Sequence, residues 1–452
     1  MGADRHIIHR LVLDIEAPDK AMADQASNRI VHLLHHDLLP KLEKYLDELE
    51  VSHHFLIDKL ALDLGKMRTD QLEGFSEKLI EAIHEAMETP ETRKNVQTGQ
   101  LLSQGDKAFH TFIYFLETGK LPWHTYAGKD WLSDELIWLE LLKEPLSEAS
   151  GRIILQNLLF QSPAAFHRLL SQFTPFFSSR VIEKLKGRSE GSLQVTVKTI
   201  FNRFIQRIKS SGTAEDSAEN TEYVQFERLA FILAFYDQLT DDGAHAVRII
   251  TELSAGKDNI AAAIKKIKPG EGRSGKQEPA RDESAHGGLF IQNAGLVILH
   301  PFLHYFFMDF GLVAENGFTD EPARQLAVHL LHYLATGKTE PAEYDLSFEK
   351  FLCNWPEEQP VERFIAIPQR MCDEADHLLK AAIGHWKVLK NTSPDGLREG
   401  FLTRAGKLVT TGEPTILYVE KNTIDVLLSS LPWGLGVIKL PWMPEPFYVD
   451  WQ

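Results

Sequence analysis

The sequence is poor in cysteine, in positive charge and in long apolar runs, and each shortage excludes a class of protein. Cys353 and Cys372 are its two cysteines, so a disulfide framework is excluded and a reducing compartment is expected. Asp and Glu outnumber Lys and Arg by 64 to 48, and the net charge of −16 disfavours nucleic acids and anionic membranes as partners. No window approaches the ~18 apolar residues of a membrane-spanning helix, and the opening MGADRHIIHR lacks a signal-peptide core. We therefore expect a cytoplasmic protein.

Motifs of nucleotide-binding enzymes are also scarce. The stretch GEGRSGKQ at 270–277 matches a phosphate-binding loop except that Gln277 replaces the hydroxyl residue that binds magnesium. A phosphate-binding loop needs a buried strand before it and an apolar helix after it, whereas polar, charged sequence surrounds this one. We interpret it as part of a linker.

Histidine is plentiful, with 19 residues, but its spacing does not define a metal site. His32 with His36 and His300 with His304 have the i, i+4 spacing that places two imidazoles on one helical face, yet neither pair has the glutamate of a zinc-protease motif. Hydrogen-bonded, partly buried histidines are the simpler interpretation. No nucleophile motif is present either, so the sequence predicts no catalytic, metal-binding or cofactor-binding residues and no enzyme.

What the sequence has is globular composition, with 43% hydrophobic residues and room for several domains. Period-two alternation in RLVLDIE (10–16) and KLALDLG (59–65) predicts two strands. Amphipathic spacing predicts a helix over 30–49, kinked by Pro40, and another over 70–87. We therefore predict a β-α-β-α domain at 1–95.

The rest of the chain favours helices. Residues 100–267 have helical periodicity with aromatic faces, which predicts a helical middle domain. The polar stretches 210–220 and 268–288 predict mobile linkers, and the second is the better domain boundary. A C-terminal domain at 289–452 is expected to be helical until β-branched and aromatic runs at 415–420, 436–441 and 446–451 form a small terminal sheet. The predicted fold is mainly α with small β elements (α+β).

Two short segments in these helical regions resemble each other. FLETGK at 115–120 and YLATGK at 333–338 both place a glycine after a helical run. A shared helix-stop signal and an internal duplication explain this similarity equally well.

The chain ends with an unusual density of tryptophan. Trp433, Trp442 and Trp451 lie nine residues apart, with four prolines among them. They either close the core of the terminal sheet or form a docking surface, since tryptophan is enriched at binding hot spots. With Trp386, they are the candidate protein-interaction residues, and core closure is the favoured alternative.

The chain also resembles a known family, the tape measure proteins of contractile injection systems. The resemblance rests on NAGLVILHPFL (293–303), AVHLLHYLATGK (327–338), HWKVLKNTSPDGLREGFL (385–402) and LPWGLGVIKLPWMPEPFYVDW (431–451). HRLVLDIE (9–16) and FLETGKLPW (115–123) are similar too. The match is firm over 289–452 and loose between 124 and 288.

The resemblance implies a non-enzymatic assembly protein of a phage-tail-like particle, one that sets tube and sheath length or initiates tube assembly. It implies tube, baseplate, spike or terminator-cap proteins as partners, and a location in the bacterial cytoplasm during assembly or within the finished particle. A continuous helix of this length would reach about 680 Å, but the 21 prolines and the predicted linkers predict compact domains instead. A folded adaptor or chaperone-like protein of the cap, baseplate or cargo is therefore the alternative to a stretched ruler.

Overall fold

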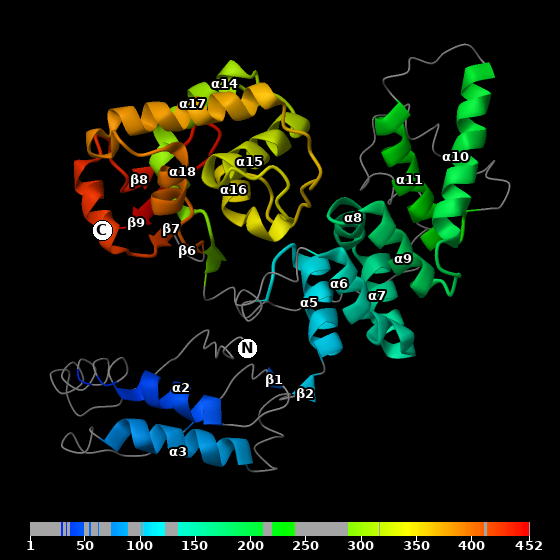
Figure 1. Cartoon of the computed structure of the whole chain (residues 1–452), viewed down its shortest axis with the longest axis horizontal. Helices are drawn as coiled ribbons and strands as arrows, with labels where there is room; N and C mark the ends of the chain where they lie inside the picture. The colour runs from blue at the N-terminus through cyan, green and yellow to red at the C-terminus, as the bar shows by residue number, and fades with distance from the viewer. Residues whose placement is uncertain are drawn as a thin grey trace. The chain divides into compact units, whose positions relative to one another are not determined.

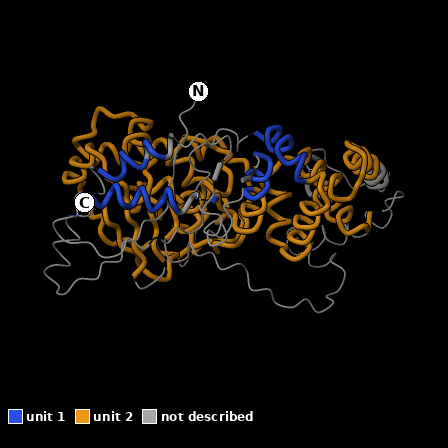
Figure 2. The backbone as a smooth tube through the Cα atoms, turned by 90° about the horizontal axis from the view of Figure 1, so that it is seen from below, with its two compact units in different colours: residues 1–111, 122–145 blue, residues 112–121, 146–452 orange. Residues whose placement is uncertain are grey.

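The computed structural model describes residues 29, 33, 37–48, 54–55, 62, 74–88, 101–102, 104–122, 134–210, 219–239, 288–315, 317–410 and 414–451. The chain divides into two compact units, residues 1–111 with 122–145 and residues 112–121 with 146–452 (Figure 2). Helix α5 (Gln104–Thr118) runs from the first unit into the second. The predicted boundary at 268–288 lies outside the described residues apart from Gly288, so the predicted domain limits stay a prediction.

The first unit is described mainly at its helices. It contains α2 (Leu39–Glu48), α3 (Phe75–Glu88), α6 (Glu135–Lys143) and the short antiparallel strands β1 (His54–Phe55) and β2 (Leu101–Leu102). Helices α2 and α3 pack through an apolar cluster of Leu38, Phe75 and Leu79. The predicted helices of this region are confirmed where it is described, whereas the predicted strands at 10–16 and 59–65 lie outside the described residues except for Leu62.

The predicted kink at Pro40 corresponds to a change in helix geometry. Residues 37–38 form a wider π-helical turn, and α2 begins directly after it. Proline has no N–H for the regular helical hydrogen bond, so a change of helix type beside Pro40 fits its chemistry.

The middle of the second unit is a helical array, as predicted. It comprises α7 (Ala149–Gln161), α8 (Pro163–Ser171), α9 (Pro175–Leu185), α10 (Ser192–Ser210) and α11 (Glu219–Phe235). Ser162 caps α8 and Thr174 caps α9, each followed by a proline at the first helical position, which is the preferred way to start a helix. Phe173 stacks on Phe177 with ring centroids 4.3 Å apart, and both contact Phe112 of α5. The array thus packs on the end of α5.

The C-terminal region is built from helices around one apolar core. Its helices are α14 (His300–Asp309), α15 (Glu321–Thr336), α16 (Ser347–Leu352), α17 (Gln369–His385) and α18 (Pro394–Leu397). Shorter turns are η6 (Ala294–Leu299), η7 (Glu343–Asp345), η8 (Lys387–Leu389), η10 (Thr423–Ser430) and the π-helical η9 (Arg398–Leu402). Helix α15 packs against α16, α17 and η9, and Figure 1 shows α15 and α16 beneath α17 and beside the sheet strands.

A small mixed sheet closes this core. Its strands are β3 (Leu289–Ile291), β6 (Gly406–Val409), β7 (Ile416–Val419), β8 (Val437–Ile438) and β9 (Phe447–Asp450), in the order β3-β6-β7-β9-β8, with β7 and β9 parallel and the other pairs antiparallel. A separate hairpin joins β4 (Val313–Ala314) to β5 (Gly317–Phe318). The terminal sheet and the α+β fold class are confirmed.

The expectation that the C-terminal domain is helical from residue 289 onwards is wrong at its start. Residues 289–291 form β3 and pair with β6, which the sequence analysis did not predict. The run from 289 to 299 is almost uniformly apolar, so its periodicity does not distinguish a buried strand from a helix. Its partner strand lies more than 100 residues further along the chain, beyond the reach of local patterns.

Candidate functional site

Helix α5 ends at a left-handed glycine that leaves two carbonyl groups in need of donors. Gly119 has φ of 74°, and its N–H donates to the carbonyl oxygen of Phe115 at 2.8 Å. The carbonyl groups of Leu116 and Glu117 lie in the final turn of α5, where helices run out of internal donors. An additional donor is therefore required beside Gly119, which is itself buried.

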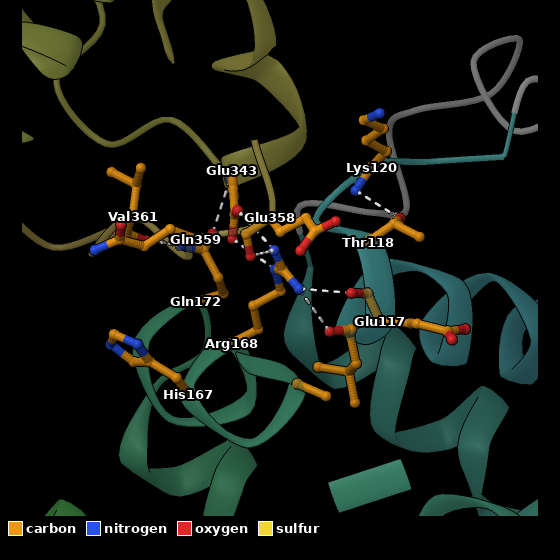
Figure 3. A network of polar contacts seen from close by, with 12 residues as sticks. Glu117, Thr118, Lys120, His167, Arg168, Gln172, Glu343, Glu358, Gln359 and Val361 are labelled. Atoms are coloured by element: carbon orange, nitrogen blue, oxygen red, sulfur yellow. Dashed lines mark hydrogen bonds and ion pairs between the residues drawn. The ribbon is translucent and has the colours of Figure 1, made fainter. Parts of the chain in front are cut away.

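Arg168 of α8 supplies that donor and is completely buried. Its Nη1 donates to the carbonyl oxygens of Leu116 at 3.0 Å and Glu117 at 2.8 Å. Its Nε and Nη2 donate to the carboxylate of Glu343 at 3.1 and 3.3 Å, and Nη2 also reaches the carbonyl oxygen of Glu358 at 2.7 Å (Figure 3). A planar guanidinium suits this two-sided role, because its rigid fork presents several donors at once.

Glu343 and Lys350 extend the network into the C-terminal region. The Nζ of Lys350 donates to Glu343 Oε1 at 2.9 Å and to the carbonyl oxygens of Glu357 at 2.7 Å and Gln359 at 2.9 Å. Burial lowers the pKa of Lys350, and the charge of Glu343 opposes that shift. Two buried cations therefore share one buried carboxylate.

Gln172 and Arg363 add hydrogen bonds beside this ion pair. The side chain of Gln172 donates to the carbonyl oxygen of Val361 at 2.5 Å and accepts from the backbone N–H of Glu343 at 2.8 Å. Arg363 donates from Nη1 to the carbonyl oxygen of Gln172 at 3.0 Å and from its backbone N–H to that of Ser171 at 3.3 Å. Both α8 and the segment 357–363 are thus held along their backbones as well as by charge.

A second carboxylate, Glu362, lies between an imidazole and a guanidinium group. Its Oε1 is 2.9 Å from His167 Nε2 and its Oε2 is 2.8 Å from Arg228 Nη1. Burial raises the pKa of Glu362, but His167 and Arg228 outweigh burial and leave the pKa below its usual value. Its backbone carbonyl oxygen accepts from His329 Nε2 at 2.7 Å. Burial lowers the pKa of His329 to about 4.

We call this whole contact the polar joint. One side consists of the end of α5, helix α8 and Arg228 of α11; the other consists of the segments 341–345 and 357–363 with Lys350 of α16. An ion pair between Lys120 and Glu357 lies at its exposed edge, and Phe115 meets Tyr344 with ring centroids 5.6 Å apart. The joint therefore contains hydrogen bonds, ion pairs and an aromatic contact.

The second TGK segment ends α15 in the same way, within the C-terminal region alone. Gly337 has φ of 73°, and Arg398 Nε donates to the carbonyl oxygen of Leu334 at 3.2 Å, the position that corresponds to Leu116. The guanidinium of Arg398 also binds Asp376 at 2.6 Å and Asp395 at 2.8 Å. We refer to Gly119 with Arg168 as the first clasp and to Gly337 with Arg398 as the second clasp.

The likeness of the clasps extends to their flanking side chains. Thr118 and Thr336 each donate to the carbonyl oxygen four residues earlier at 2.8 Å, and each accepts from the backbone N–H two residues later at 3.1 Å. Each arginine follows a Ser-Pro helix start: Ser162 caps the helix of Arg168, and Ser393 caps that of Arg398. Both capping hydrogen bonds measure 3.1 Å. A shared helix stop explains the glycines but not the arginines, which favours duplication.

The four candidate tryptophans make their polar contacts within the chain. Trp386, Trp442 and Trp451 are buried, and Trp433 is half-buried. Their indole N–H groups donate to Ser430 Oγ at 3.0 Å, Leu352 O at 2.7 Å, Asp425 Oδ2 at 3.2 Å and Ile298 O at 2.9 Å, respectively. These positions favour core closure, and a role of these residues in binding a partner stays a prediction.

The cysteines and histidines considered in the sequence do not form a reactive site within the described residues. Both cysteine thiols are buried; burial raises the pKa of Cys372 and raises that of Cys353 still further, so both disfavour the reactive thiolate. His300 Nδ1 donates to the carbonyl oxygen of Val297 at 2.9 Å, and burial lowers the pKa of His300. Within the described ranges, no three His, Cys, Asp or Glu side chains gather as a metal site would require. His32 and His36 lie outside those ranges.

Fold and site together define a mainly helical protein organised around buried polar contacts. No described helix combines the length and apolarity needed to span a membrane. The sequence profile of the contractile injection system tape measure proteins matches residues 5–451, and the chain belongs to that family. No curated protein and no solved structure gives a significant match.

Sequence reasoning missed the residues of the polar joint. Arg168, Glu343 and Glu362 belong to no motif; Glu343 lies 175 residues from Arg168, and Glu362 lies 195 residues from His167. The one available signal was the similarity of the two TGK segments, since each marks a helix end that needs a donor. A search for an arginine behind a Ser-Pro pair downstream of each segment would have found both clasps.

Proposed function

We propose that this chain is a non-enzymatic assembly protein that controls the length of the tube and sheath, or initiates the tube, while it is folded. The observation that carries the folded form is the burial of Arg168 and Glu343 in one ion pair. Threading the chain through a tube as an extended ruler would separate these residues and would also bring the apolar core of the C-terminal region into water, at a cost of roughly 25 cal/mol per Å² of apolar surface.

Family membership supports the assembly role, and tube, baseplate, spike or terminator-cap proteins are the proposed partners. The net charge of −16 argues against nucleic acid or an anionic membrane in that position. Assembly in the bacterial cytoplasm, with the chain retained or released afterwards, fits these partners. A helical adaptor of the cap, baseplate or cargo is the alternative, and it shares the folded form.

The first experiment is electron microscopy of particles from a producing strain with and without the chain. Loss of uniform length, or loss of long tubes, is the expected result. Particles unchanged in number and length would contradict length control and favour the adaptor.

A second pair of variants separates a folded controller from a stretched ruler. One variant lacks residues 268–287, and its matched counterpart carries a polar insertion of equal size at the same place. A ruler would shorten and lengthen the particle by roughly 30 to 70 Å, the span of about 20 residues as helix or extended chain. A folded controller leaves the mean length unchanged in both variants, which is the outcome we expect.

A further inference from the structure

The two sides of the polar joint carry opposite charges. The side formed by α5, α8 and α11 presents Lys120, His167, Arg168 and Arg228, which we call the basic surface. The side formed by the C-terminal region presents Glu343, Glu357 and Glu362, which we call the acidic surface. Lys350 and Arg363 also belong to the acidic side, where Lys350 shares Glu343 with Arg168 and Arg363 binds the backbone of α8. Each surface is thus complementary to the other and not to itself.

A joint of this composition can separate and form again. Interfaces held by polar contacts resemble those of transient complexes, whereas permanent interfaces are more apolar. A buried ion pair contributes little net stability compared with an apolar contact of equal volume. When both surfaces part completely, Arg168 and Glu343 regain water together, and neither remains buried without a partner.

The chain between the two surfaces is long enough for each surface to bind either its counterpart in the same molecule or the counterpart in a second molecule. The basic surface ends with α11 and the described chain stops at Leu239, while the C-terminal region begins at Gly288. The predicted linker alone, residues 268–287, could span up to about 70 Å if extended. That reach permits the acidic surface of one molecule to meet the basic surface of another.

We propose that the polar joint also closes between two copies of this chain, which exchange their C-terminal regions. Each exchanged dimer then contains two joints with the same contacts as the joint within one molecule. Exchange of identical elements needs no new surface and is a common route to dimers. Covalent connection gives the internal joint an effective concentration on the order of mM, so a dilute solution holds mainly monomer.

The second clasp differs from the first in that all of its residues lie in the C-terminal region. Arg398 binds Asp395 and Asp376, which lie three and 22 residues away in the sequence and in the same C-terminal region. A rigid-body exchange of that region carries the whole second clasp with it. Exchange is therefore a property of the first clasp alone.

Two charge-reversal variants of the full-length chain test this proposal. The first carries Lys120→Glu with Arg228→Glu, and the second carries Glu357→Lys with Glu362→Lys. In each variant alone, like charges face each other across the internal joint, so the joint opens. In a mixture, each joint of the exchanged dimer pairs opposite charges again. Light scattering of the equimolar mixture should show a twofold increase in molar mass over either variant alone.

Two controls keep the result interpretable. A chain with all four substitutions restores the opposite charges within one molecule, and it should be monomeric with the circular dichroism spectrum of the unchanged protein. The pair Lys41→Glu and Glu77→Lys reverses an ion pair between α2 and α3 of the first unit, and mixing these two variants should leave them monomeric. A mixture of the joint variants that stays monomeric, while the fourfold variant folds normally, would overturn the proposal.

Discussion

The first and second clasps use the same local device in two different settings. Both end a helix at a left-handed glycine, and both fill the open carbonyl positions with an arginine from a Ser-Pro helix start. Gly119 is buried under Glu343, whereas Gly337 is exposed to solvent. The first clasp draws its carboxylate from 175 residues away, and the second draws both of its carboxylates from nearby in the sequence. The same helix-end arrangement thus also forms, in the first clasp, a contact between distant parts of the chain.

Replacing the two arginines should give the largest difference in stability between the two clasps. Arg168→Ala removes a donor from three carbonyl groups and leaves the buried Glu343 with Lys350 as its remaining charged partner, which should cost about 3–5 kcal/mol. Arg398→Ala frees Asp376 and Asp395, whose side chains are 38% and 79% exposed and can bind water, so about 1–2 kcal/mol is expected. Urea unfolding of both variants measures the difference, and equal losses would mean that burial does not set the value of the clasp.

Adding a methyl group at each glycine should give the next largest contrast. A Cβ at position 119 would lie 2.5 Å from Glu343 Oε1 and 2.9 Å from Arg168 Nε, whereas a Cβ at 337 would have its nearest neighbour 3.7 Å away, at Arg398. Both substitutions cost about 1–2 kcal/mol for the left-handed backbone. Gly119→Ala should cost roughly 2 kcal/mol more, because it also displaces a buried ion pair.

Thermal unfolding of the two alanine variants provides the measurement. The larger drop in Tm should belong to Gly119→Ala. A drop of the same size for Gly337→Ala would show that the backbone conformation alone limits both positions.

His329 lies between the two clasps, and its titration should make the stability of the folded protein depend on pH. It lies on α15, the helix that ends at Gly337, and it binds the backbone of Glu362 in the polar joint. Its pKa of about 4 in the folded protein lies below the usual value of 6.5, so folding opposes protonation. The stability that neutral His329 contributes is present above pH 6.5 and is lost progressively as the pH falls towards 4, by about 2 kcal/mol between pH 7 and pH 5.

Glu362 adds a second loss at lower pH. Its pKa lies below the usual value of 4.5, so its stabilising charge is present above that value and is lost as the pH falls through the lower, folded pKa. The variant His329→Gln retains a side-chain donor for the carbonyl oxygen of Glu362 without the titration. Its urea midpoint should change less between pH 7 and pH 5 than that of the unchanged protein, and an identical change would assign the effect to other groups.

Sequence patterns predicted the parts of this fold that depend on neighbours along the chain. The strands at 416–419 and 447–450 were visible as β-branched and aromatic runs between Gly and Pro, and the TGK helix ends were visible as glycine stops. Strand β3 was missed, because a uniformly apolar segment has no diagnostic period. The partnership of Arg168 with Glu343 was beyond prediction, since either residue alone resembles an ordinary surface charge and only folding brings them together.

Removing the threonines should have the smallest effect and should be equal in the two clasps. Thr118 and Thr336 make the same two hydrogen bonds at the same distances, 2.8 Å to a carbonyl oxygen and 3.1 Å from a backbone N–H. Both threonine side chains are half-buried, and their hydrogen bonds lie within a single helix end. The different burial and partners of Arg168 and Arg398 should therefore not affect them. Thr118→Ala and Thr336→Ala should each cost about 1 kcal/mol in urea unfolding. Unequal costs would mean that Glu343 and its neighbours affect the whole end of α5 and not Gly119 and Arg168 alone. The helix ends of the two clasps could then no longer be treated as equivalent.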